Sequence, residues 1–238
     1  MPTRLIRVVF DALDVHAQSC FWAAALGWPL DEHPHGDGAS VGPRDGEAHL
    51  LFVPSDELKT AKNRLHLDLA GRPDQARKVD HLIGLGAARA DIGQGQVPWE
   101  VLADPEGNEF CVLAAADPYT AEGPLAAISL DAAKPAAQGR FWAAAAGWPV
   151  MEQDDDAVVL RSASGHGPVL MMGPPVAPKP VKNRLHLDVA PVSDGDQRRE
   201  VSRLLDAGAS RVDANHRGAS GEMLADPEGN EFCVIERR

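Results

Sequence analysis

The clearest hydrophobic pattern in the chain is a strict alternation over residues 62–69, which read KNRLHLDL. A period of two is typical of a β-strand, because successive side chains point to opposite faces. The pattern places leucines on one face and ionisable side chains on the other: Leu65, Leu67 and Leu69 opposite Arg64, His66 and Asp68. We therefore predict a strand that packs its leucines on a helix and turns its polar side chains toward water or a polar cavity.

This strand occurs twice. The letters KNRLHLD return 120 residues later, where Arg184, His186 and Asp188 take the polar positions. Two other stretches also repeat: FWAAALGWP at 21–29 is matched by FWAAAAGWP at 141–149, and LADPEGNEFCV at 102–112 returns at 224–234. Three repeats in one order, at nearly one offset, indicate a duplicated domain rather than a short solenoid repeat.

We place the first domain at 1–115, the linker at 116–121 and the second domain at 122–238. In the first copy, Asp14 is expected to cap a helix that ends near Leu26, and Pro73 to open a second helix that ends near Leu85. The predicted strands there lie near residues 5–10, 28–32, 39–41, 48–53, 63–69, 88–92, 97–102 and 109–113. Each copy thus reads as two successive βαβββ modules.

The second copy follows the same order. Its helices are expected near residues 132–146 and 193–206. Its strands are expected near residues 126–130, 148–152, 157–161, 168–172, 183–189, 210–213, 221–224 and 230–235.

Composition and charge limit the classes of molecule that the protein is expected to bind. The chain has 238 residues and a formal net charge of −12, which argues against nucleic acid and anionic membranes, since both attract basic surfaces. No apolar run approaches the ~20 residues that a membrane span needs. The three cysteines are too few and odd in number for a disulfide framework. We interpret the protein as cytoplasmic and expect a small-molecule partner.

FWAAALGW, KNRLHLD and DPEGNEFCV, in that order and twice, resemble the vicinal oxygen chelate superfamily of glyoxalase I, bleomycin-resistance proteins and extradiol dioxygenases. The likeness is to the glyoxalase-like domain and covers nearly all of the chain. It implies an α+β fold of four βαβββ modules in two tandem domains, whose curved mixed sheets enclose small-molecule cavities. It also implies that a monomer with an internal pseudo-dimer is sufficient, with a homodimer as the alternative.

The resemblance implies where a metal would bind, since metalloenzymes of this family take ligands from the first and last strands of two modules. His66 and His186 stand at first-strand positions, whereas Arg7 and Ala127 stand at the other two. Where the family has a last-strand glutamate, this chain has Cys111 and Cys233. We therefore expect no cofactor and no complete metal site.

The alternative is a divalent metal (Zn, Ni, Fe or Mn). Two ligand sets are then possible: His66, Glu109 and Cys111, or His186, Glu231 and Cys233. The catalytic candidates are His66, Glu109, His186 and Glu231. For each histidine, a structural hydrogen bond to a carboxylate competes with a role as general base.

We expect two ligand cavities, lined by the same residue types in each copy. The candidates are Arg64, His66, Asp68, Trp99, Glu109 and Cys111 in the first, and Arg184, His186, Asp188, Glu231 and Cys233 in the second. The structural alternatives are a salt bridge from each aspartate to the arginine of its own copy, and buried thiols. Trp99 is replaced by Gly221 in the second copy. If modules pair within a copy, the Trp99 cavity gains an aromatic wall and is the working site.

Three classes of function remain. The first is a small-molecule-binding protein of the bleomycin-resistance kind, and the second is a metal-dependent lyase, isomerase or dioxygenase. The third is a non-catalytic accessory module that uses the fold only for association. The missing ligands favour the first class over the second, and the repeated ionisable strand face favours it over the third.

Overall fold

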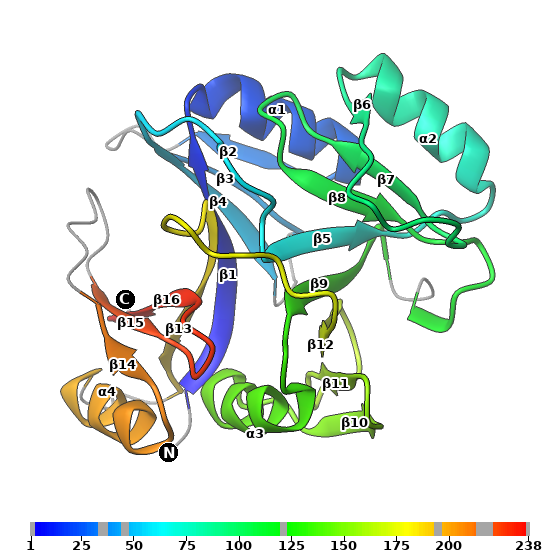
Figure 1. Ribbon diagram of the computed structural model, residues 1–238. Helices are drawn as coiled ribbons and strands as arrows, with labels where there is room; N and C mark the ends of the chain where they lie inside the picture. The colour runs from blue at the N-terminus through cyan, green and yellow to red at the C-terminus, as the bar shows by residue number, and fades with distance from the viewer. Residues whose placement is uncertain are drawn as a thin grey trace.

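The computed structural model of the chain describes residues 3–32, 38–43, 48–119, 123–192, 197–212 and 221–236. These residues form four modules, each with one helix and four strands (Figure 1). None of the helices in these ranges has the length and apolar character that crossing a membrane requires.

The first copy contains modules 1 and 2. Module 1 comprises β1 (Thr3–Ala12), α1 (Val15–Leu26), β2 (Leu30–Glu32), β3 (Ala39–Val41) and β4 (His49–Pro54). Module 2 comprises β5 (Leu65–Leu69), α2 (Gln75–Gly84), β6 (Ala88–Arg89), β7 (Glu100–Ala103) and β8 (Glu109–Val112).

The second copy contains modules 3 and 4. Module 3 comprises β9 (Leu125–Asp131), α3 (Pro135–Ala146), β10 (Val150–Gln153), β11 (Val158–Arg161) and β12 (Val169–Gly173). Module 4 comprises β13 (Leu185–Pro191), α4 (Gln197–Asp206), β14 (Ser210–Arg211), β15 (Gly221–Ala225) and β16 (Glu231–Ile235). The α+β class and the βαβββ order are those predicted from the sequence, with shifts of a few residues at element ends.

The modules assemble into two mixed sheets of eight strands. Sheet A has the order β14-β15-β16-β13-β1-β4-β3-β2, and sheet B has the order β10-β11-β12-β9-β5-β8-β7-β6. Sheet A therefore joins modules 1 and 4, and sheet B joins modules 2 and 3. The pairs at the two seams, β1 with β13 and β5 with β9, are antiparallel.

Pairing within a copy, the condition on which the prediction for the Trp99 cavity depended, is not met. Each sheet takes one module from each copy, because β1 is hydrogen-bonded to β13 and not to β5. β5 and β13 begin with the same letters, LHLD, so local sequence offers β1 two equivalent partners. The 1–115 and 122–238 boundaries remain a prediction about sequence units, and each sheet crosses them.

Helix ends follow local chemistry. The Asp14 side chain accepts a hydrogen bond from the Ala17 amide and caps α1, which ends at Gly27 with φ of 66°. The second helix does not begin at Pro73, as predicted, but at Gln75, because the Asp74 side chain caps it. The first residues predicted for the fourth helix, 193–196, lie outside the described residues.

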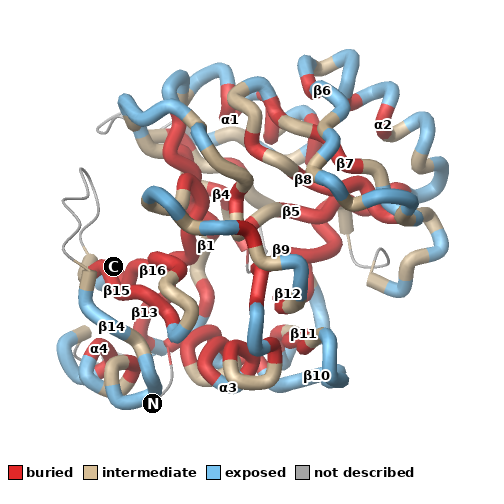
Figure 2. Tube along the Cα trace, viewed as in Figure 1, coloured by how far each residue is buried: buried red, intermediate tan, exposed pale blue. Residues whose placement is uncertain are grey.

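Aromatic contacts tie together the two modules of each copy. On α1, Trp22 lies against Phe110 of β8, with ring centroids 5.2 Å apart. In the second copy, Trp142 of α3 lies against Phe232 of β16 at 5.4 Å. These rings belong to one continuous core that runs through all four modules. Figure 2 shows the central strands buried and the outer sides of α2 and α4 exposed.

This arrangement predicts how half of the chain behaves. Residues 1–115 alone would leave the seam edges of β1 and β5 unpaired. Because β5 has the core sequence of β13, we expect two copies of the fragment to pair β1 with β5 reciprocally and form a dimer. Light scattering coupled to gel filtration measures this. A folded monomer at micromolar concentration would contradict the cross-copy pairing.

Candidate functional site

The helix-free face of sheet B brings together the polar residues of β5 and its neighbours. Leu65, Leu67 and Leu69 lie in the core under the helices, so His66 and Asp68 point to the opposite face. Strand register places Ser129 beside His66 and Ala127 beside Asp68. Cys111 pairs with Asp68 from β8. One face therefore collects side chains from both modules of the sheet.

Asp68 is the centre of this group. The Ser129 hydroxyl donates to its Oδ2 at 2.6 Å, and His66 Nε2 lies 3.4 Å from its Oδ1. Oδ1 is buried and has no hydrogen-bond partner within the part of the chain that the structure describes. Leaving such an oxygen unsatisfied costs about 1–3 kcal/mol, so a donor that reached it would be stabilising. Asp188 Oδ1 of sheet A is in the same state within the described ranges. The predicted salt bridge from Asp68 to Arg64 is absent among these contacts.

Cys111 completes a group of three possible metal ligands. One donor atom each from His66, Asp68 and Cys111 lies within 4.8 Å of the others. Burial raises the pKa of the Cys111 thiol, and the Asp68 charge raises this pKa further. In the absence of a cation the residue is therefore a neutral thiol and a poor nucleophile.

Sheet A carries a counterpart that is closed. Arg7 stands where sheet B has Ala127, and its Nε donates to Asp188 Oδ2 at 2.7 Å. His186 Nε2 lies 3.5 Å from Asp188 Oδ1, but the His186 side chain is 3% exposed, against 20% for His66. The buried Cys233 has its pKa raised to about 12, mainly by desolvation. The two aspartates therefore differ in that Asp188 has an arginine partner at the position where sheet B has an alanine.

Trp99 lies at the edge of the open face. It directly precedes β7 and is 38% exposed, and with Val101 it lines a pocket of about 460 Å³. Val101 pairs with Cys111, so this pocket adjoins the Asp68 group along β7 and β8. Its counterpart Gly221 approaches Cys233 so closely that a Cβ would lie 2.4 Å from the sulfur. A bulky wall residue is thus excluded from sheet A at this position.

Tyr119, which sequence reasoning missed, covers the module 3 side of the same face. It follows β8 in the predicted linker and packs against two small apolar clusters of sheet B. Its hydroxyl donates to Glu152 Oε2 at 2.7 Å. Burial and the neighbouring Glu152 raise the pKa of Tyr119 to about 12, so it remains a neutral donor. An aromatic residue in a linker rich in alanine was the only signal.

Comparisons with known proteins agree with this architecture. A family model described as "Glyoxalase-like domain" matches residues 7–113 and 127–235. The chain belongs to the glyoxalase-like domain family. Among curated proteins, no sequence matches it.

Solved structures show the same tandem fold at low sequence identity. Glyoxalase I from Zea mays is 14% identical with a TM-score of 0.66, over 98% of this chain and 92% of that one. A "putative dioxygenase" from Bacillus subtilis is 12% identical with a TM-score of 0.62, over 99% and 85% of the two chains. At these identities the likeness shows the fold alone.

The metal site of the family takes ligands from two modules, and in this glyoxalase-like protein only one of the two modules has possible ligands at those positions. Module 2 supplies His66 and Cys111 on sheet B. At the neighbouring first-strand and last-strand positions, module 3 supplies Ala127, Ser129 and Met171. A metal on this face would therefore be held by His66, Asp68 and Cys111, which all belong to module 2 and form the donor group found among the described residues.

Glu109, predicted as a ligand beside His66 and Cys111, is used elsewhere. Lys59 Nζ donates to its Oε1 at 2.7 Å, and the Asn63 amide donates to its Oε2 at 3.2 Å. Glu231 has the equivalent partners in the second copy, the Lys179 side chain and the Asn183 amide. Asp68 takes the place of Glu109 in the donor group.

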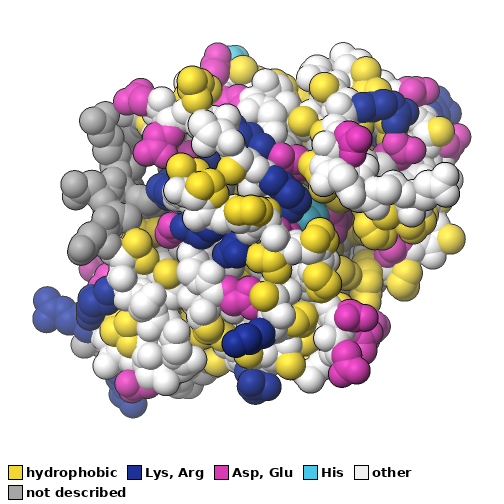
Figure 3. Space-filling model, in the orientation of Figure 1, with side chains coloured by type: hydrophobic (Ala, Val, Ile, Leu, Met, Phe, Trp, Pro, Cys, Tyr) yellow, Lys and Arg dark blue, Asp and Glu magenta, His cyan; other side chains and the backbone are white. Residues whose placement is uncertain are grey.

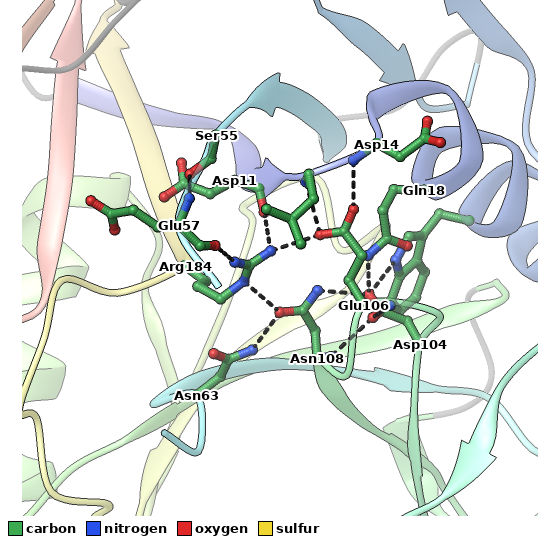
Figure 4. Close-up of polar contacts among 12 residues, drawn as sticks. Asp11, Asp14, Gln18, Ser55, Glu57, Asn63, Asp104, Glu106, Asn108 and Arg184 are labelled. Atoms are coloured by element: carbon green, nitrogen blue, oxygen red, sulfur yellow. Dashed lines mark hydrogen bonds and ion pairs between the residues drawn. The ribbon is translucent and has the colours of Figure 1, made fainter. Parts of the chain in front are cut away.

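Arg64 and Arg184, predicted to line the cavities, instead connect the two sheets. Figure 4 shows the Arg184 guanidinium between the carbonyls of Asp11 and Glu57 and the side chains of Glu106 and Asn108. Its contact with Glu106 Oε2 is 2.7 Å long, and the two side chains are only 7% and 9% exposed. The guanidinium thus holds the β7–β8 turn of sheet B against β1 of sheet A.

Arg64, which precedes β5 of sheet B, makes the equivalent contacts with the β15–β16 turn of sheet A and with the loop before β13. Its Nε donates to the Ala177 carbonyl at 2.7 Å, and its Nη1 donates to the Glu228 carbonyl and to Asn230 Oδ1. The side chain leaves sheet B because Arg64 precedes the first residue of β5. Neither arginine is part of the Asp68 or Asp188 group.

We expect Arg184→Met to lower the free energy of unfolding by about 3 kcal/mol, since it leaves the buried Glu106 carboxylate without its cation. Urea denaturation measures this. The exposed Arg140→Met is the matched control and should shift stability by less than about 0.5 kcal/mol. Equal effects of the two substitutions would show that Arg184 does not connect the sheets.

Proposed function

We propose that this protein binds a small molecule on the helix-free face of sheet B and has no complete catalytic metal site. The observation that carries the proposal is the difference between the two sheets at Asp68 and Asp188. Asp188 is held by Arg7 beside a buried histidine, whereas no lysine or arginine contacts Asp68 within the described ranges. The accessible His66 lies next to it.

The lining residues indicate the chemistry of the ligand. Asp68 Oδ1 can accept a hydrogen bond from a ligand, and His66 offers a second polar contact. Trp99 offers a flat apolar surface at the adjoining pocket. A ligand with a hydroxyl or amino group on a flat apolar body satisfies these groups together.

The test is a ligand screen followed by matched histidine variants. We expect His66→Ala to weaken binding of the best ligand about tenfold, because a polar contact worth roughly 1.4 kcal/mol is lost. His186→Ala, at the buried counterpart, should change the affinity less than twofold. Isothermal titration calorimetry measures both, and Trp99→Ala tests the stacking surface. Equal loss from both histidine variants would reject sheet B as the working face.

A second candidate is a metal-dependent lyase, isomerase or dioxygenase, and the grouping of His66, Asp68 and Cys111 favours it. An imidazole, a carboxylate and a thiol suit a divalent ion of the zinc or iron type. When bound, such an ion polarises a substrate oxygen. The protein would hold the ion with these three side chains and orient Asp68 through Ser129.

Cobalt substitution separates the two candidates. If the second holds, adding Co²⁺ to metal-free protein produces a thiolate-to-cobalt absorption band, because the metal deprotonates Cys111. The band should disappear in Cys111→Ser and persist in Cys233→Ser. Absence of the band at millimolar Co²⁺ would remove this candidate and leave the metal-free binding site.

A further inference from the structure

A second concave region lies between the loops that precede β5 and β13. These loops, residues 56–64 and 178–184, are equivalent in the two copies and enclose a groove of about 590 Å³. That volume is in the range of small-molecule sites. Figure 3 shows Lys and Arg side chains gathered around hydrophobic ones over the middle of this face.

Charges in the groove are layered with the cations outward. Four lysines line it, and each is ion-paired with a carboxylate: Lys59 with Glu109, Lys62 with Asp131, Lys179 with Glu231 and Lys182 with Asp11. The lysine side chains are 15–24% exposed, and their carboxylates are only 4–12% exposed. Two exposed carboxylates, Asp56 and Glu57, also line the groove, so its lining has six cationic side chains against two acidic ones.

Arg64 adds a cation with no carboxylate partner. Its described contacts are the carbonyls of Ala177 and Glu228 and the Asn230 amide oxygen, whereas Arg184 is paired with Glu106. The whole chain has a net charge of −12, whereas cations outnumber carboxylates among the residues that line this groove, which makes the lining a cation-rich patch. Such a patch attracts anions by a local field.

The rim of the groove is apolar. Leu58 and Val181 stand at corresponding places in the two loops and are 72% and 50% exposed. Pro178 and Pro180 extend this surface on the second loop. Apolar side chains beside ammonium groups fit a ligand that has both an anionic group and an apolar part.

We propose that this groove binds a small organic anion with an apolar portion, at a site separate from the face of sheet B. The anionic group contacts lysines of both loops, and the apolar part rests on Leu58 and Val181. The proposal does not depend on the function proposed for the Asp68 group, because the two sites share no lining residue.

The test uses 8-anilinonaphthalene-1-sulfonate, an amphipathic anion, in a fluorescence titration of the full chain. We expect saturable binding of one equivalent that weakens as salt rises toward physiological strength, because screening reduces the attraction of the lysines. Leu58→Glu should weaken binding about tenfold by adding a negative charge at the rim. It leaves the fold intact, since Leu58 is largely exposed.

Ile83→Glu, the same kind of substitution at an exposed position of α2, is the matched control and should leave binding unchanged. Pyrophosphate should compete with the probe through the anionic subsite. Three outcomes would overturn the proposal: binding insensitive to salt, equal loss in both glutamate variants, or loss of binding in His66→Ala, which would place the probe on sheet B.

Discussion

Two buried carboxylates, Asp104 and Asp226, connect the four modules. A carboxylate out of water must be fully hydrogen-bonded, and desolvation raises the pKa of both despite their many donors. Asp104 accepts from Gln18 and Trp22 of module 1 and from Asn108 of its own turn. Asn108 in turn accepts from Arg184 of module 4. Modules 1, 2 and 4 are therefore connected through the hydrogen bonds of Asp104 and Asn108.

The sequence predicted the elements well because their signals are local. Leucine alternation, helix caps and the Asp-Pro-Glu-Gly-Asn turn act within a few residues. Partner choice at the seams is a long-range property, and the identical letters of β5 and β13 conceal it. The two arginines were misassigned for a related reason, since a side chain just before a strand does not follow the alternation of that strand.

The candidate site was predicted in part. His66, Asp68 and Cys111 share a face because strand register brings them together, and parity within each strand anticipated their direction. Glu109 shares that parity, but Lys59 and a backbone amide hold it at the start of β8. Ser129 and Tyr119 come from the second copy and the linker, so no motif near His66 could identify them.

Cross-copy pairing also sets the order in which the molecule can fold. The seam of sheet B forms through contacts of moderate sequence separation. Ser129 and Asp68, for example, are 61 residues apart. Sheet A closes only when Arg7 meets Asp188, across 181 residues. Because distant contacts form slowly, the seam edge of β1 remains unpaired on the ribosome until the last module emerges, although its other edge can pair with β4. The sheet that carries the accessible histidine can therefore be complete while the other still exposes an open edge.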